Sequence, residues 1–359
     1  MKVCWLTLSP APYTLKLFNE IGKSIDLSVV LFNQVEKNRN DEWKIEDDNN
    51  FKLYEIGKDY NNLINKLADE CDLLVDGFYL SIYGYKAVNA FSKRNKKTVL
   101  IADGGIAKNR GILVNAIMSF LMKKHNFCFS SSEITDRYFM YYGVDKNKIK
   151  HYKFTSLTNK DISYNKELTK RKEELRKELK IDSDFVILSV GQPIKRKGFD
   201  ILLESYVKSN LNNDACLYIV GGKPQEEVNN YVKNNNLKNV RFIELLNSEE
   251  LKKYYAIADC FILCTREDIW GLVIEEAMSF GLPVITSDNC VCGLHFEKTG
   301  SCLICGVNDV DAYAYSLNKV FKNEEIRNRL SNSALTNIKE YTIEKSASVL
   351  VSICEETLN

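Results

Sequence analysis

The feature that most constrains this fold is a regular alternation of short apolar runs with helix-like stretches. In the first half, KVCWLTLS, DLSVVLF and TVLIADGG have the length of strands, and helix-like segments such as YTLKLFNEIGKS and AVNAFSKRNK stand between them. Strands that alternate with helices form βαβ units, whose strands lie parallel in a sheet that helices cover. The chain is therefore predicted to be an α/β protein.

The alternation is interrupted once, which divides the chain into two parts. Residues 158–182 are highly charged, and their second half is predicted to be an exposed helix beside a linker. The pattern then resumes, and 359 residues are too many for one ordinary core. We predict two doubly wound, Rossmann-like domains that face each other across a cleft, 1–160 and 161–342. A last helix, 343–359, fits either domain, and we expect it to pack back on the first.

The composition is typical of a soluble globular protein. Hydrophobic residues make up 45% and charged residues 27%, and the formal net charge is only +1, which predicts no general affinity for nucleic acid. No apolar run is long enough to span a bilayer, and the N-terminal MKVCWLTLSPAPY fits a first strand better than a signal peptide. Eleven cysteines without an export signal indicate free thiols in a reducing cytoplasm.

Four of the cysteines stand close together around a histidine: Cys290, Cys292, Cys302 and Cys305, with His295 between them. These spacings are compatible with a zinc site. The alternative is that SCLIC forms a strand, in which Cys302 and Cys305 point to opposite faces. We favour buried thiols and predict no metal site.

The loop after the apolar run FVILSV has the character of an anion-binding turn. In GQPIKRKGFDILLESY, Gly191 opens the turn, Arg196 and Lys197 lie in the loop, and Gly198 precedes a helix. Backbone N–H groups, the positive end of a helix dipole and two full charges together favour a phosphate. The alternative is a solvated basic loop. The segment is neither a Walker A loop nor a G-x-G-x-x-G turn.

A second strand, CFILCT, is followed by REDIWGLVIEEAMSF and then by a Gly-Leu-Pro stop. Gly271 permits a close approach of the backbone to a ligand, and the N–H groups of Gly271 and Leu272 are expected to point at an anion. Two phosphate sites at strand ends of one domain suggest a diphosphate. Asp268 and Glu276 flank this turn, and as carboxylates they are expected to bind hydroxyls.

A nucleotide sugar matches this arrangement, with Glu276 on the ribose and Asp268 on the sugar. The alternative is that the acids are solvated residues at a helix start, where the dipole favours them. For Glu267 and Glu275, which have the same spacing one residue earlier, we adopt that alternative. In the first half, Asp103 follows a predicted strand and precedes two glycines. It is a candidate to orient or deprotonate a hydroxyl, or a simple turn residue.

These motifs resemble those of family 4 glycosyltransferases, which have the two-domain GT-B fold, and the resemblance covers residues 184–300. The family hallmark is two glutamates with seven residues between them, around Phe-Gly-Leu-Val and followed by Ala-Met. Here Glu276 precedes the Ala-Met pair, Asp268 replaces the first glutamate, and Trp270 replaces the phenylalanine. Gln192 stands where many members have arginine.

The resemblance implies a retaining hexosyltransferase that moves a sugar from a nucleotide diphosphate sugar to a glycan or lipid-linked acceptor. It implies that Arg196 and Lys197 bind the diphosphate, that Ile243 to Leu245 lie near the base, that the first domain is the acceptor side, and that neither cofactor nor metal is needed. PAPYTLKLFNEIGK, ADGGIAK and HYKFTSLTNKDI are similar to the subset that acts in bacterial surface-polysaccharide assembly. The alternatives are a nucleotide-sugar epimerase of the same fold and a non-catalytic sugar-nucleotide-binding protein.

The segment AKNRGILVNAIMSFLMKKH places an apolar helix between basic residues, which are Lys108, Arg110, Lys123 and Lys124. It is too short to span a bilayer, but residues 108–124 fit an anionic membrane surface, where lipid-linked acceptors are found. The alternative is an ordinary core helix with polar ends. The protein is expected in the cytoplasm and, on the first interpretation, at the inner face of the cell membrane.

Overall fold

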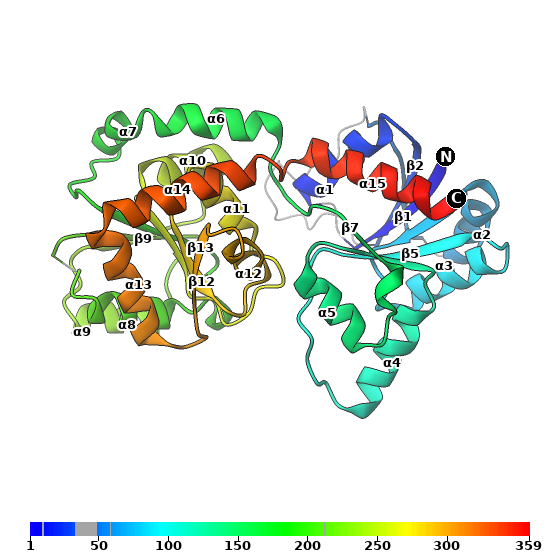
Figure 1. Ribbon diagram of the computed structural model, residues 1–359, viewed down its shortest axis with the longest axis horizontal. Helices are drawn as coiled ribbons and strands as arrows, with labels where there is room; N and C mark the ends of the chain where they lie inside the picture. The colour runs from blue at the N-terminus through cyan, green and yellow to red at the C-terminus, as the bar shows by residue number, and fades with distance from the viewer. Residues whose placement is uncertain (9–10, 33–48, 58, 212) are drawn as a thin grey trace. The chain divides into compact units, whose positions relative to one another are not determined.

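Figure 1 shows the computed structural model, which describes residues 1–8, 11–32, 49–57, 59–211 and 213–359. The chain divides into two compact units. Unit 1 comprises Met1–Ser156 and Tyr341–Asn359, and unit 2 comprises Leu157–Glu340. Each unit contains one parallel sheet with helices, which confirms the predicted α/β class with two Rossmann-like domains.

Unit 1 is built on a seven-stranded sheet with the order β3-β2-β1-β4-β5-β6-β7. Its strands are β1 Lys2–Thr7, β2 Asp26–Leu31, β3 Lys52–Glu55, β4 Leu73–Asp76, β5 Lys97–Ala102, β6 Phe127–Ser130 and β7 Ile149–His151. All of its strand pairs are parallel. The carboxyl ends of the strands therefore share one edge, and ligands of doubly wound sheets bind at that edge.

The helices of unit 1 come from both ends of the chain. They are α1 Pro12–Gly22, α2 Tyr60–Glu70, α3 Ile82–Ser92, α4 Ile112–Lys123, α5 Glu133–Tyr141, the 3-10 turn η2 Lys146–Lys148 and α15 Ile343–Leu358. In Figure 1, α1 and α15 lie side by side. α15 buries Leu350 and Cys354, so the last helix contributes to the packing of unit 1.

Unit 2 has a six-stranded parallel sheet with the order β10-β9-β8-β11-β12-β13. Its strands are β8 Val186–Val190, β9 Cys216–Val220, β10 Val240–Ile243, β11 Cys260–Leu263, β12 Val284–Ser287 and β13 Cys302–Cys305. Its helices are α6 Asn159–Thr169, α7 Lys172–Glu178, η3 Lys195–Lys197, α8 Phe199–Lys208, α9 Glu226–Asn234, α10 Ser248–Ile257, α11 Leu272–Ser279, α12 Val291–Glu297, α13 Val310–Lys322 and α14 Glu324–Ile338.

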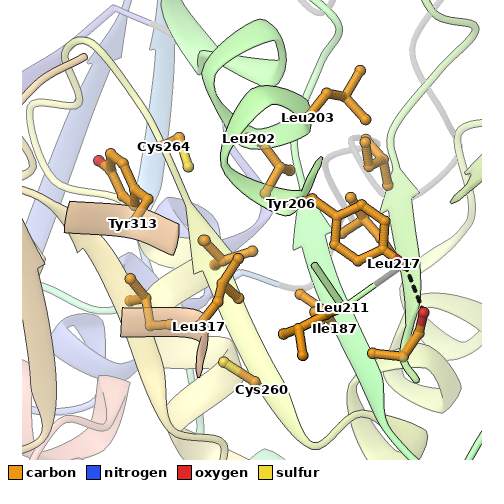
Figure 2. Packing of buried hydrophobic residues seen from close by; sticks show 14 of the residues in the cluster. Ile187, Leu202, Leu203, Tyr206, Leu211, Leu217, Cys260, Cys264, Tyr313 and Leu317 are labelled. Carbon is orange, nitrogen blue, oxygen red and sulfur yellow. Dashed lines mark hydrogen bonds between the residues drawn. The ribbon is translucent and has the colours of Figure 1, made fainter. Parts of the chain in front are cut away.

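The central strands of unit 2 are buried along their whole length. Every residue of β8, β9 and β11 is buried, as expected for parallel strands that helices cover on both faces. Figure 2 shows part of this core, in which Tyr206 lies among Leu202, Leu211 and Leu217. The Tyr206 hydroxyl donates a hydrogen bond to the carbonyl oxygen of Ala215 at 2.6 Å, so its burial leaves no polar atom unsatisfied.

The charged stretch 158–182 belongs to unit 2 and contains α6 and α7. The prediction of an exposed helix beside a linker is wrong in one respect, because α7 is docked: Leu175 is only 1% exposed. In α6, Leu168 is buried in the same way. α7 packs against α10, and α6 packs against α10 and α11. The charged residues around the buried leucines hide this packing in the sequence.

Asp259 connects α7 to the sheet of unit 2. Its carboxylate accepts hydrogen bonds from Arg176 Nη2 at 2.6 Å, from Lys172 Nζ at 2.6 Å and from the N–H of Val186 at 2.7 Å. The side chains of Arg176 and Asp259 are 11% and 18% exposed. Burial lowers the pKa of Lys172, although the carboxylate of Asp259 acts in the opposite direction. This carboxylate is therefore the common counterion of two partly dehydrated cations.

Asp259→Ala is expected to destabilise unit 2 by about 2 to 4 kcal/mol, because two cations lose their shared counterion and the N–H of Val186 loses its acceptor. The midpoint of urea unfolding, at an unchanged slope, measures the effect. The control is Glu178→Ala, which removes the exposed partner of Lys253, 2.6 Å away, and should change stability by at most about 0.5 kcal/mol. Equal midpoints for Asp259→Ala and the parent protein would contradict this prediction.

Candidate nucleotide-sugar site

The loop between β8 and α8 is held against two neighbouring strand ends. The N–H of Gly191 donates to the carbonyl oxygen of Val220 at 2.9 Å, so the loop starts beside the end of β9. The basic turn η3, Lys195–Lys197, follows. Gly198 has φ 69°, and a Cβ there would lie 1.9 Å from the carbonyl oxygen of Cys264. Glycine is required both by this conformation and by the close approach to the end of β11.

Lys197 and Asp268, predicted from two separate motifs, form one ion pair. Lys197 Nζ lies 2.6 Å from Asp268 Oδ2, and the two side chains are 13% and 12% exposed. Arg196 Nη1 lies 3.8 Å from the same oxygen and donates to the carbonyl oxygen of Glu267 at 2.6 Å. Both cations therefore converge on the turn that contains Asp268. A charge-assisted hydrogen bond in a partly dehydrated position is stronger than one in open solvent.

The turn that contains Asp268 leads directly into α11. The N–H of Asp268 donates to the carbonyl oxygen of Asn289 at 3.0 Å, which fixes the start of the turn. Gly271, at φ 104°, is the N-cap of α11, and a Cβ there would lie 2.8 Å from Cys290 Sγ. Glycine is thus required at this position too. The helix begins at Leu272, so the positive end of its dipole lies at the turn.

Glu276 has a hydrogen-bond partner that sequence reasoning missed. The hydroxyl of Tyr255, a buried residue of α10, donates to Glu276 Oε2 at 2.8 Å. Burial raises the pKa of the Glu276 carboxyl, and the hydrogen bond from Tyr255 opposes that shift. The residue nevertheless remains partly exposed. Nothing in KKYYAIAD distinguishes this tyrosine from a core residue, so no signal in the sequence indicated the pair.

The prediction that Glu267 and Glu275 are both solvated is wrong for Glu275. Glu275 is 0% exposed and accepts a hydrogen bond from Trp270 Nε1 at 3.0 Å. Glu267 is partly exposed, and its carbonyl oxygen is the acceptor for Arg196. Glu267 lies in the loop before α11, whereas Glu275 lies in the helix, where successive residues point in directions about 100° apart. One residue further along, Glu276 is partly exposed.

The predicted base-side segment lies beside a glycine turn. The N–H groups of Gly221 and Gly222, which follow β9, donate to the carbonyl oxygen of Ile243 at 3.1 Å and 3.3 Å. Leu245 is 70% exposed, so it offers apolar surface near this turn. Gly191, Gly221 and Ile243 all lie at the carboxyl ends of parallel strands of one sheet, which is where such sheets bind ligands.

Asp103 belongs to unit 1, and it follows β5 directly, as its motif indicated. The Tyr152 hydroxyl donates to Asp103 Oδ1 at 2.9 Å. The residue keeps exposed surface, yet desolvation by the surrounding protein raises the pKa of Asp103 to about 6, and the hydrogen bond from Tyr152 opposes the shift. A carboxyl group that titrates near neutral pH is suited to proton transfer.

The clustered cysteines are buried thiols. Cys302 and Cys305 lie in β13, which confirms the strand predicted for SCLIC, and both are buried. Burial raises the pKa of Cys290 to about 12, so this thiol stays protonated at neutral pH. Among the residues that the structure describes, no group of three or more His, Cys, Asp and Glu side chains is arranged to hold a metal ion.

Helix α4 has a row of exposed apolar side chains, which we call the α4 patch. Its members are Ile112, Leu113, Val114, Ile117 and Phe120, which are 93%, 74%, 44%, 50% and 55% exposed. The alternative of an ordinary core helix is therefore wrong, because only Met118 and Met122 of α4 are buried. Within the described ranges, none of the helices has both the length and the apolar character that crossing a membrane requires.

One of the basic residues predicted to flank this helix has partners of its own. Lys124 Nζ donates to Asn89 Oδ1 at 3.0 Å. It also lies 4.8 Å from the ring centroid of Tyr85 and 5.3 Å from that of Phe120. The cation is therefore held between α3 and α4 by cation–π contacts. Arg110 and Lys123 are exposed.

Two α/β units, each with a parallel sheet, are the mark of the GT-B class of glycosyltransferase folds. Solved structures of that class superpose on the chain. One is a glycosyltransferase from Rickettsia africae ESF-5, with a TM-score of 0.80, 13% identity, and coverage of 100% of this chain and 98% of that chain. Another is Alr3699/HepE from Anabaena in complex with UDP and glucose, with a TM-score of 0.75, 14% identity, and coverage of 99% and 100%.

Sequence comparison gives a more specific similarity for unit 2. Residues 170–336 match the family model described as Glycosyl transferases group 1. The chain is 32% identical over 154 residues to the O-antigen biosynthesis glycosyltransferase WclY of Escherichia coli, which is 40% of this chain and 42% of that protein. It is 31% identical over 164 residues to an uncharacterized glycosyltransferase of Haemophilus influenzae, 44% of this chain and 46% of that protein. The chain thus spans less than half the length of these relatives.

Proposed function

We propose that the protein is a retaining glycosyltransferase that transfers a hexose from a nucleotide diphosphate sugar to a glycan or lipid-linked acceptor in cell-surface polysaccharide synthesis. The observation that carries the proposal is the junction of two loops in unit 2, where Lys197 lies 2.6 Å from Asp268 at the turn that leads into the helix of Glu276. The match to group 1 glycosyltransferases and the similarity to an O-antigen biosynthesis enzyme support this class of activity.

The ion pair suits the covalent structure of such a donor. In a nucleotide diphosphate sugar, the transferred sugar is bonded directly to the terminal phosphate. A cation that binds this phosphate and a carboxylate that binds this sugar must therefore be neighbours, and Lys197 and Asp268 are neighbours. The bound donor would place its sugar–phosphate bond across this pair, with the ionised carboxylate accepting hydrogen bonds from sugar hydroxyls.

The remaining groups of unit 2 complete the donor site. Arg196, Lys197 and the N-terminus of α11 stabilise the negative charge that develops on the leaving diphosphate. Glu276 accepts hydrogen bonds from the ribose hydroxyls, and the segment from Ile243 to Leu245 contacts the base. Because cations and a helix dipole neutralise the leaving group, the proposed mechanism needs neither a metal ion nor a cofactor.

A panel of nucleotide sugars, incubated with the protein and an extract of lipid-linked acceptors, tests the proposal. We expect nucleotide diphosphate to be released only when donor and acceptor are both present, and the product to keep the anomeric configuration of the donor. Donor consumption without acceptor, with an epimerised sugar, would instead identify an epimerase. Donor binding without turnover on any acceptor would identify a binding protein, and either result would overturn the proposal.

We also propose that Asp103 orients or deprotonates the acceptor hydroxyl. Only the ionised carboxylate can accept a proton, so kcat/KM is expected to fall about tenfold per unit as the pH drops below about 6, the raised pKa of Asp103. Tyr152→Phe removes the hydrogen bond that lowers this pKa, so the fall in kcat/KM should begin at higher pH. Asp103→Asn should have a low kcat/KM at every pH, without the fall near pH 6. A fall near pH 6 that persists in Asp103→Asn would contradict this role.

We propose that the α4 patch contacts an anionic membrane surface, where lipid-linked acceptors are located. Five exposed large apolar side chains within nine residues of one helix are more than the scattered apolar residues of an ordinary surface. Arg110 and Lys123 supply the positive charge that favours anionic headgroups, and the apolar row supplies burial at the interface.

Ile112→Glu combined with Leu113→Glu should lower the fraction of protein bound to phosphatidylglycerol vesicles about tenfold or more, because both the apolar contact and the charge balance change. Flotation measures this fraction. Tyr315→Glu, at a tyrosine that is 68% exposed on α13, is the matched control and should float like the parent. Lys123→Ala should weaken binding to anionic vesicles more than to phosphatidylcholine vesicles. Flotation that is insensitive to all of these changes would remove the membrane proposal.

A further inference from the structure

Glu275 is a buried carboxylate next to the proposed donor turn. It lies in the first half of α11 and is 0% exposed. A carboxylate is expensive to bury unless hydrogen bonds compensate its lost hydration, so a position that only fills space in a core is normally apolar. Glu275 accepts a hydrogen bond from Trp270 Nε1 at 3.0 Å. The chemistry of this residue therefore has to be understood together with Trp270.

Trp270 is part of the turn that the donor is proposed to use. It stands between Asp268, which pairs with Lys197, and Gly271, the N-cap of α11. Its side chain is 2% exposed. Its carbonyl oxygen accepts hydrogen bonds from the N–H of Cys292 at 2.9 Å and from Cys290 Sγ at 3.2 Å. The backbone of Trp270 is thus anchored by the start of α12, and its side chain is anchored by Glu275.

We propose that Glu275 is a positioning residue, which fixes the Asp268–Gly271 turn by holding the indole of Trp270. The catalytic consequence rests on the proposed function, but the structural part does not. A phenylalanine, which stands at this place in the family pattern, would need no acceptor. Tryptophan brings an N–H that must be satisfied in the core, and Glu275 supplies the acceptor. Trp270 and Glu275 are therefore a matched pair, and losing either member removes this hydrogen bond from the other.

The structural part is tested by the indole N–H signals of ¹⁵N-labelled protein. The chain has three tryptophans, and Trp270→Phe identifies the signal of Trp270. In Glu275→Gln, whose amide oxygen still accepts, this signal should stay close to its position in the parent. In Glu275→Leu it should move upfield and exchange with solvent at least about tenfold faster, because the hydrogen bond is gone. An unchanged indole signal in Glu275→Leu would overturn the proposal.

The catalytic part is tested by steady-state kinetics with the donor found in the nucleotide-sugar panel. Glu275→Leu should lower kcat about tenfold or more and change the donor KM less than about threefold, because a displaced Asp268 acts on the transferred sugar. Glu275→Gln should keep most of the activity, and Trp270→Phe combined with Glu275→Leu should regain part of what Glu275→Leu loses. A double variant no better than Glu275→Leu would contradict the matched pair.

Two controls separate positioning from simple instability and from a wrong function. Glu297→Leu removes an exposed carboxylate from the neighbouring helix α12 and should leave both kcat and the indole signal unchanged. If Glu275→Leu lost activity only in proportion to its unfolded fraction, Glu275 would be a core residue without a positioning role. If the parent protein transferred no sugar from any donor, the proposed function would fail, whereas the indole measurement would still decide whether Glu275 holds the turn.

Discussion

Lys197→Ala is expected to reduce kcat/KM for sugar transfer by about 10²- to 10³-fold. The change removes a cation that binds the diphosphate in the ground state and stabilises its charge in the transition state, so donor KM should rise and kcat should fall together. It also leaves Asp268, whose side chain is 12% exposed, without a counterion 2.6 Å away. A buried carboxylate without its partner cannot keep the same position and charge, which adds to the loss.

The same loop offers a matched control for Lys197→Ala. Lys195 is exposed and also lies in η3, so Lys195→Ala removes equal charge from the loop without touching the ion pair. It should change kcat/KM less than about threefold, as expected for an exposed charge. Arg196→Ala should have an intermediate effect, because Arg196 is 46% exposed and 3.8 Å from Asp268. If Lys197→Ala and Lys195→Ala had equal kinetics, the diphosphate would have to bind elsewhere.

Asp268→Asn is expected to lower kcat about 10²-fold or more and to raise donor KM much less. Asparagine keeps the size of the side chain but loses the negative charge, so hydrogen bonds to the transferred sugar weaken most where that sugar becomes positive in the transition state. Lys197 also loses its counterion and would bind phosphate more freely, which works against any rise in KM. Initial rates over a range of donor concentrations separate the two parameters.

Glu276→Ala provides the contrast, because its proposed partner is the ribose, far from the reacting bond. It should raise donor KM and change kcat less, and it also frees the Tyr255 hydroxyl that now donates to Glu276 at 2.8 Å. Glu267→Ala should be tolerated. If Glu267→Ala abolished transfer while Asp268→Asn and Glu276→Ala did not, the assignment of the two acids would be wrong by one position. For Glu275, which was expected to be solvated and is buried, we instead propose the positioning role described above.

Much of the fold follows from local sequence patterns whose effect does not depend on tertiary contacts. Apolar runs of strand length that alternate with helix-like segments lead to parallel sheets, and both sheets have this form. Gly198 and Gly271 mark turns with positive φ that other residues rarely adopt, so their positions in the motifs already located the two loops. The spacing of Asp268 and Glu276 likewise placed one acid in a loop and the other on a helix.

What the sequence could not decide is which groups meet and how deeply they are buried. Lys197 and Asp268 are separated by 71 positions, and only the packing of η3 against the end of β11 brings them to 2.6 Å. Glu275 looked like a solvated acid, yet α11 turns it into the core beside Trp270. Leu175 likewise docks a helix whose composition indicated exposure. Periodicity indicates the direction in which a side chain points. Its hydration and its partners depend on segments that are distant in the chain, and those segments come together only when the sheets assemble.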